Sequence, residues 1–222
     1  MATSSRSSAE PIAVLAGTPV DTQMGADLLT ANGLRAVSFP LASDPLAQTA
    51  FQLSSQREKH DAVLSVLRSA REQGCGRVLV YCNSLSSSVD FDALAEETGL
   101  RIVTPLQVYR SLPARYRRLG LIAANAQGLA GIERTLYQAD PSMELLGVSL
   151  LPVVLSIEAG LPPEKLVAQH RLAELAEWFR SRGMEALVLG CTHFPYFKEA
   201  LAKRTSLPLI DPAREMLELL QA

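Results

Sequence analysis

The chain has 222 residues, 48% hydrophobic and 20% charged, which is enough for one large domain or two small ones with a substantial core. Its formal net charge of −2 gives no electrostatic reason to expect nucleic acid or an anionic membrane as a partner. No apolar run approaches the roughly 18 residues that span a bilayer, and the polar residues 1–10 lack the apolar region of a secretory signal.

The chain is expected to begin with a disordered tail, residues 1–10, because this segment is small and polar. The three cysteines are an odd number without paired spacing, which argues against a secreted disulfide framework. We therefore predict a cytoplasmic protein whose thiols are reduced and available for chemistry.

Short runs rich in Val, Ile and Leu alternate with longer amphipathic stretches, a pattern typical of βαβ units and a mostly parallel sheet. The predicted strands are Ile12–Ala16, Arg35–Phe39, Arg77–Tyr81, Arg101–Val103, Leu119–Ala123, Glu144–Ser149, Ala186–Leu189 and Leu207–Ile210. The apolar spacing predicts a helix over Gln56–Glu72. It predicts a second helix over Glu164–Arg182, opened by two prolines and ended by Gly183.

The two halves of the chain have matching spacing. From Ile12 to Cys82 is 70 residues, and from Leu119 to Cys191 is 72 residues. Each interval starts with a strand and ends in a cysteine at the carboxyl end of a buried strand. We therefore predict an α/β fold of two pseudosymmetric parallel-sheet lobes, one formed by 11–104 plus 206–222 and the other by 105–205. The site is expected in the cleft between them, because open α/β sheets bind ligands at the carboxyl ends of their strands.

Both cysteines stand where a strand passes into a helix. The first lies in RVLVYCNSLSSS (77–88) and the second in ALVLGCTHFPYF (186–197). Unpaired N–H groups at a helix start favour anions, so we expect the pKa of each thiol to be drawn down toward neutrality. A lone Cys after a strand is more often an inert small hydrophobe, and Cys75, in a Gly-Cys-Gly turn, is interpreted in that way.

Two opposed thiols can invert an amino acid without a cofactor. Inversion needs a base on one face of the α-carbon and an acid on the other, and donors that stabilise the charge developing at the carboxylate. A zinc site is the other interpretation of a Cys/His cluster, but only Cys191, His193 and the distant Cys82 are candidate ligands, so we predict no metal.

Several segments resemble the aspartate/glutamate racemase superfamily. LGCTHFPYF (189–197) resembles glutamate racemases in particular, YCNSLS (81–86) is similar to the family's Cys-Asn-Thr/Ser block, and LLPVVLSIEAG (150–160) and LIDPA (209–213) resemble two further segments. The resemblance implies two pseudosymmetric lobes, no pyridoxal phosphate or other cofactor, a small acidic amino acid as substrate, and a homodimer.

The resemblance also assigns roles to residues. It implies catalysis by Cys82 and Cys191, with His193 holding a proton for the nearby thiol. The substrate-binding candidates are Thr18, Asn83, Ser84, Asn125, Thr192 and His193, and the auxiliary candidates are Asp21 and Glu158.

The chain departs from the glutamate racemase pattern in two turns. The Asp-Ser-Gly turn expected after the first strand is replaced by Ala16-Gly17-Thr18, and a Gly-Thr after the fifth strand by Ala123-Ala124. Asp21 either replaces the missing carboxylate or caps the following helix.

Three functions therefore stay open. The first is a two-cysteine racemase of glutamate or aspartate. The second is another reaction of the superfamily, of the maleate isomerase or hydantoin racemase type. The third is a non-catalytic amino-acid-binding protein.

Overall fold

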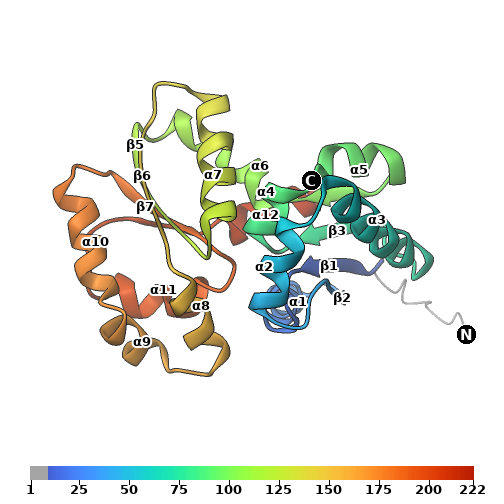
Figure 1. The fold of residues 1–222 in the computed structure, drawn as a ribbon, viewed down its shortest axis with the longest axis horizontal. Coiled ribbons are helices and arrows are strands. Elements are labelled where there is room, and N and C mark those ends of the chain that lie inside the picture. Colours follow the sequence, from blue (N-terminus) through green and yellow to red (C-terminus); the bar gives the residue numbers. More distant parts are fainter. Residues whose placement is uncertain (1–9) are drawn as a thin grey trace, which may run out of the picture.

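The computed structural model describes residues 10–222 and contains two α/β lobes (Figure 1). Each lobe is built on a four-stranded parallel sheet. The tail expected at 1–10 lies outside the described residues apart from Glu10, which is exposed. No helix within residues 10–222 is both long and apolar enough to cross a membrane.

The first lobe has the strand order β2-β1-β3-β4. Its strands are β1 (Ile12–Ala16), β2 (Ala36–Pro40), β3 (Arg77–Val80) and β4 (Arg101–Val103). Its helices are α1 (Pro19–Ala31), α2 (Pro45–Leu53), α3 (Gln56–Glu72), α4 (Asn83–Ser88), α5 (Phe91–Thr98) and, from the end of the chain, α12 (Ala213–Gln221).

The second lobe has the strand order β6-β5-β7-β8. Its strands are β5 (Arg118–Ala123), β6 (Glu144–Ser149), β7 (Ala186–Gly190) and β8 (Leu209–Ile210). Its helices are α7 (Ala126–Ala139), α8 (Leu151–Glu158), α9 (Pro163–Gln169), α10 (Leu172–Ser181) and α11 (Pro195–Ala202). The connection between the lobes contains α6 (Pro105–Tyr109) and a 3₁₀ turn, Leu112–Ala114.

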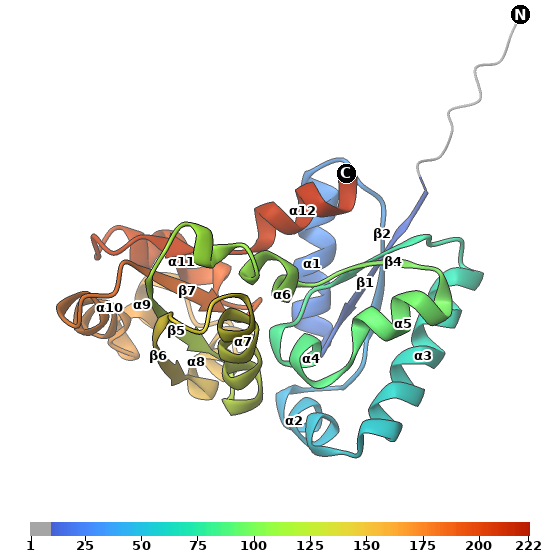
Figure 2. The same cartoon turned by 90° about the horizontal axis from the view of Figure 1, so that it is seen from above.

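The two sheets repeat one topology, as the matched spacing predicted. In each, the second strand lies on one side of the first and the third strand on the other, so each sheet has a switch point beside its first strand. The strand after each switch point, β3 or β7, leads into one of the cysteine motifs. Figure 2 shows the two lobes side by side, with α4 of the first lobe next to α7 of the second.

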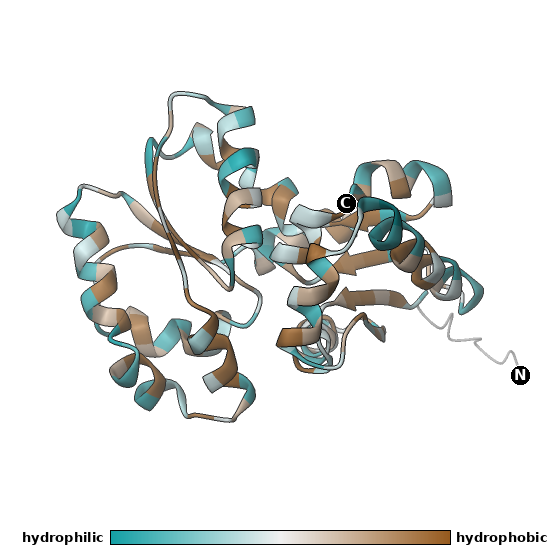
Figure 3. Cartoon of the chain, in the orientation of Figure 1, coloured by the Kyte–Doolittle hydropathy of each residue, from teal (hydrophilic) through white to brown (hydrophobic). Residues whose placement is uncertain are grey.

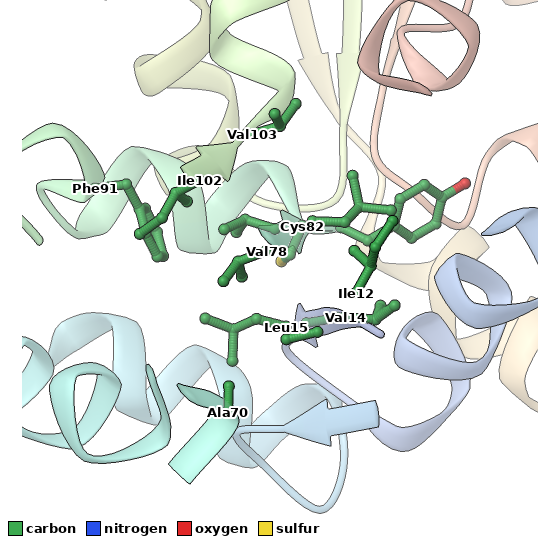
Figure 4. Packing of buried hydrophobic residues seen from close by; sticks show 14 of the residues in the cluster. Ile12, Val14, Leu15, Ala70, Val78, Cys82, Phe91, Ile102 and Val103 are labelled. Carbon is green, nitrogen blue, oxygen red and sulfur yellow. The ribbon is translucent and has the colours of Figure 1, made fainter. Parts of the chain in front are cut away.

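The core of each lobe is formed by its central strands, because helices cover both faces of the sheet. All five residues of β1 and of β7 are buried. Figure 3 shows these strands as hydrophobic, whereas the helices around them combine hydrophobic and hydrophilic residues. Cys82 is one of the residues of the first lobe's buried core (Figure 4).

The helix predicted over Glu164–Arg182 was wrong, because the segment forms two helices, α9 and α10. The chain turns at Arg171, whose φ of 51° lies in the left-handed region. Just before it, His170 Nε2 lies 2.8 Å from Ser156 Oγ on α8. This break allows the apolar faces of both short helices to pack into the same core.

The boundary expected at 206 also differs in the structure. β8 pairs in parallel with β7, with Leu187 opposite Leu209, so residues up to Ile210 extend the second sheet. Only α12 returns to the first lobe, where Met216 and Leu220 join the buried core. The second lobe has only three strands before α11, and β8, which follows α11, is the fourth strand of its sheet.

Candidate active site

Cys82 and Cys191 occupy equivalent positions in the two lobes and line one cavity between them. Cys82 is the N-cap of α4, and Cys191 follows β7 directly. Both thiols are free, and both residues are buried, with 3% and 6% of their surfaces exposed. The cavity has a volume of about 20 Å³, room for about one water molecule, so the two lobes lie close together around the thiols.

A short chain of hydrogen bonds leads away from Cys191. His193 Nδ1 lies 3.6 Å from Cys191 Sγ, and His193 Nε2 lies 2.9 Å from Glu158 Oε1. Burial acts to lower the pKa of His193, but its hydrogen bonds with Cys191 and Glu158 outweigh burial and raise that pKa to about 10. The imidazole is therefore cationic at neutral pH.

Thr18 connects this chain to the first lobe. Its hydroxyl lies 2.9 Å from Glu158 Oε1 and 3.0 Å from Asp21 Oδ1, and donates its one proton to either carboxylate. Thr18 is fully buried and caps α1. Neither Thr18 nor Glu158 lines the cavity. They contact two residues that do line it, Asp21 and His193.

Asp21 combines the two roles considered for it. Its Oδ1 accepts a hydrogen bond from the backbone N of Thr18 at 2.6 Å, which completes a capping box at the start of α1. It also lines the cavity. Burial raises the pKa of Asp21 from 3.8 to about 6, although the charge of His193 and the Thr18 hydrogen bonds act to lower it.

Asn83 lines the cavity and carries a side-chain donor without a partner. The hydroxyl of Tyr109, on α6, donates to Asn83 Oδ1 at 2.7 Å and so fixes the orientation of the amide. Among the described residues, Asn83 Nδ2 is the one buried side-chain N or O atom without a hydrogen-bond partner. A buried donor without a partner is costly. A carboxylate bound in the cavity would satisfy it.

The expected effect of the helix start on Cys82 was wrong. Burial raises the pKa of Cys82 from 9.0 to about 12, and the nearby Asp21 carboxylate adds to the rise. Hydrogen bonds from Ser84 and from the backbone of Leu85 act in the opposite direction without outweighing burial. Desolvation of a thiolate therefore dominates over the short helix α4.

Helix α2 contributes side chains that the sequence analysis did not single out. Gln48 Nε2 lies 3.0 Å from Cys82 Sγ and 3.3 Å from Ser84 Oγ, to which Gln52 Nε2 also donates at 2.7 Å. Gln52 Oε1 in turn accepts from Asn125 Nδ2 of the second lobe at 3.0 Å. The Asp44-Pro45 pair marks a helix start, and glutamines four residues apart share a helix face, so this signal was present in the sequence.

The cavity brings together most of the predicted site. Its lining includes Asp21, Cys82, Asn83, Ser84, Asn125, Cys191, Thr192 and His193 from the predicted set. The lining residues that the sequence analysis missed are Pro45, Gln48, Thr49, Ala124, Gly128, Leu151, Val154 and Gly190. The two thiols thus lie in one enclosed space with an imidazole, a carboxylate and several amides.

A family model for Asp/Glu/Hydantoin racemases matches residues 49–220. The chain belongs to this racemase family. Among curated relatives it is similar to glutamate racemases of Thermus thermophilus and Limosilactobacillus reuteri. It is 30% identical to the first over 159 residues, or 68% of this chain and 57% of that protein. It is 24% identical to the second over 151 residues, which cover 66% of this chain and 56% of that protein. The matched region thus spans little more than half the length of these relatives.

Solved structures of racemases share the fold. The structure of glutamate racemase from Francisella tularensis in complex with D-glutamate has a TM-score of 0.73 at 20% identity. The structural match covers 96% of this chain and 79% of the Francisella tularensis chain. An aspartate racemase homologue from Pyrococcus horikoshii OT3 has a TM-score of 0.68 at 15% identity, covering 96% of this chain and all of that one. The two-lobed α/β fold is therefore that of the racemases.

Proposed function

We propose that the protein is a racemase that inverts the α-carbon of an amino acid with Cys82 and Cys191 as the acid–base pair. The observation that carries the proposal is that two free thiols, from equivalent strand ends of the two lobes, line one cavity. Membership of the racemase family supports it. The curated relatives are named glutamate racemases, so glutamate is the first substrate to test. Aspartate is the second, because the sequence motifs resemble the aspartate/glutamate racemase superfamily.

The surroundings of the two thiols suggest their roles. Cys82 has a raised pKa and acts as the acid, and Cys191, 3.6 Å from His193 Nδ1, acts as the base in the direction described here. The Cys191 thiolate removes the α-proton from one face of the substrate, and the Cys82 thiol delivers its proton to the other face. The reaction ends with the two cysteines in exchanged protonation states, and the reverse reaction restores them.

The charge that develops on the substrate needs donors around its carboxylate. Asn83 Nδ2 is the unused donor there, and the hydroxyls of Ser84 and Thr192 lie in the same wall. Asp21, the carboxylate of the cavity wall, is the partner for the substrate ammonium group. These groups supply both the acid–base chemistry and the charge stabilisation, so the proposed reaction needs no cofactor.

The test is loss of the α-proton signal by NMR when the protein is incubated with amino acids in deuterated water. Cys82→Ser and Cys191→Ser should each abolish racemisation. Cys75→Ala is the matched control, because Cys75 is equally buried but does not line the cavity, and it should retain turnover. Near-normal turnover in either active-site variant would refute the two-cysteine mechanism.

A further inference from the structure

The cavity between the two thiols is too small to hold an amino acid. Its volume of about 20 Å³ accommodates about one water molecule, which is less than the backbone atoms of an amino acid alone occupy. The proposed reaction places the α-carbon of the substrate between Cys82 and Cys191. Part of the cavity wall therefore has to withdraw before a substrate can bind.

Much of the wall is firmly held. The amide of Asn83, at the buried start of α4, is fixed by the hydroxyl of Tyr109. Moving the two lobes apart would separate α4 from α7, and these helices pack so closely that a Cβ on Gly131 would overlap the side chain of Ser87. Opening at either place therefore gives up buried contacts.

Helix α2 has little buried apolar surface. Of its nine residues only Pro45 and Gln52 are buried, and Phe51 is partly buried against the core of the first lobe. Leu46 and Leu53 are 68% and 67% exposed. Because hydrophobic stabilisation scales with the apolar area that is buried, this helix has little of it to lose when it moves.

The side chain of Gln48, on α2, fills the space next to Cys82. Its Nε2 donates to Cys82 Sγ at 3.0 Å and lies 3.3 Å from Ser84 Oγ. The carboxamide also lies directly on the backbone of Gly17, where a Cβ would overlap Cδ and Nε2 of Gln48. Gln48 thus occupies a slot that exists because residue 17 has no side chain. A substrate needs the same contact with the Cys82 sulfur.

We infer that Gln48 is the gate of the site: in the free protein its carboxamide occupies part of the substrate's place and shields Cys82, and it withdraws with α2 when a substrate enters. The inference rests on the proposed function, because that function defines where the substrate lies. Withdrawal breaks the side-chain hydrogen bonds of Gln48 and Gln52, which water or the substrate can replace. It leaves the sheets of both lobes in place.

The test is the rate at which iodoacetamide alkylates Cys82 in mildly alkaline solution without substrate, followed by mass spectrometry of the Cys82 peptide. Gln48→Ala removes both the N–H donor and the bulk of the side chain, whereas Gln48→Met removes the donor and keeps the length. Loss of the donor disfavours the reactive thiolate in both variants, so the comparison isolates the obstruction. Cys82 should be alkylated at least about fivefold faster in Q48A than in Q48M, because reactivity follows access to the sulfur.

Two controls accompany this comparison. Cys75 is the internal reference, because it is equally buried but does not line the cavity, and its rate should be the same in all variants. Leu53→Ala alters the exposed side of α2 and should leave the Cys82 rate at that of the wild type. Equal Cys82 rates in Q48A and Q48M would overturn the inference. So would an equal rise at Cys75, since it would report a general loosening of the fold.

Kinetics of α-proton exchange give a second measurement. A substrate of Q48A no longer has to displace the carboxamide, so its KM should be lower than in Q48M by about threefold or more. Equal KM values would also overturn the inference, while the exchange itself would leave the racemase function standing. Faster alkylation of Cys82 in Q48A, in a protein that exchanges no amino acid, would overturn the proposed function and support the gate over this thiol.

Discussion

Replacing Asp21 by Asn should change how the stability of the protein depends on pH. The pKa of Asp21 rises from 3.8 to about 6 because the carboxyl is buried, with 1% of the residue exposed. Each pKa unit corresponds to about 1.4 kcal/mol, so ionising this carboxyl in the folded state costs about 3 kcal/mol of stability.

The sign follows from the direction of the shift. A carboxyl whose pKa is raised on folding stabilises the folded state while it is protonated. For Asp21 this stabilisation is fully present below pH 3.8 and is lost as the pH rises through about 6. About 0.5 kcal/mol of this loss has already occurred at pH 4, so roughly 2 kcal/mol is lost between pH 4 and pH 7. Asn keeps an acceptor for the capping box but does not ionise, so D21N should gain about 2 kcal/mol relative to the wild type over that range.

The assay is urea unfolding of both proteins at several pH values between 4 and 8. Asp44→Asn is the matched control, because Asp44 also caps a helix but is exposed, and hydrogen bonds from Ala47 and Ser43 hold its pKa below 3.8. Its contribution should therefore have the opposite sign, being lost as the pH falls. A difference between D21N and wild type that stays constant from pH 4 to pH 7 would refute the reasoning.

Three further substitutions have expected outcomes. Tyr109→Phe removes the hydroxyl that holds Asn83, so urea unfolding should show a loss of about 1–3 kcal/mol and steady-state kinetics a raised KM. Gly190→Ala would bring a Cβ to 2.8 Å from a backbone carbonyl oxygen of β5, and should cost about 1–3 kcal/mol by the same measurement. Glu158→Gln removes the charge that helps to keep His193 protonated, so kcat should fall more than substrate binding, and its pH profile should shift to lower pH.

Much of the fold was predictable because the apolar pattern along the chain is local. The bounds of Ile12–Ala16, Arg101–Val103, Glu144–Ser149 and Gln56–Glu72 agree with the structure. The pattern could not show the break at Arg171, since apolar residues recur on both sides of it and the turn depends on packing against α8. It also could not show which sheet the short β8 would join, because strand pairing is a tertiary property.

The site was predicted where its residues adjoin the cysteines in sequence, and missed where only the fold brings them near. Gln48 contacts Cys82 from 34 residues away, and Tyr109 contacts Asn83 from 26 residues away. The raised pKa of Cys82 has the same origin, since burial is set by neighbours distant in the sequence. The homodimer and the cytoplasmic location stay predictions.

The chain passes between the two lobes twice, once in the connection through α6 and once between β8 and α12, at Asp211-Pro212. Two covalent crossings define a line, and the lobes can turn about that line far more easily than they can twist or slide across it. Such a rotation separates the Asn125–Gln52 and Glu158–Thr18 pairs, the hydrogen bonds that join the lobes on either side of the cavity. Opening of the site to admit a substrate by such a swing would break polar contacts that water can replace, and would also part α4 from α7 and Met24 of α1 from the core of the second lobe.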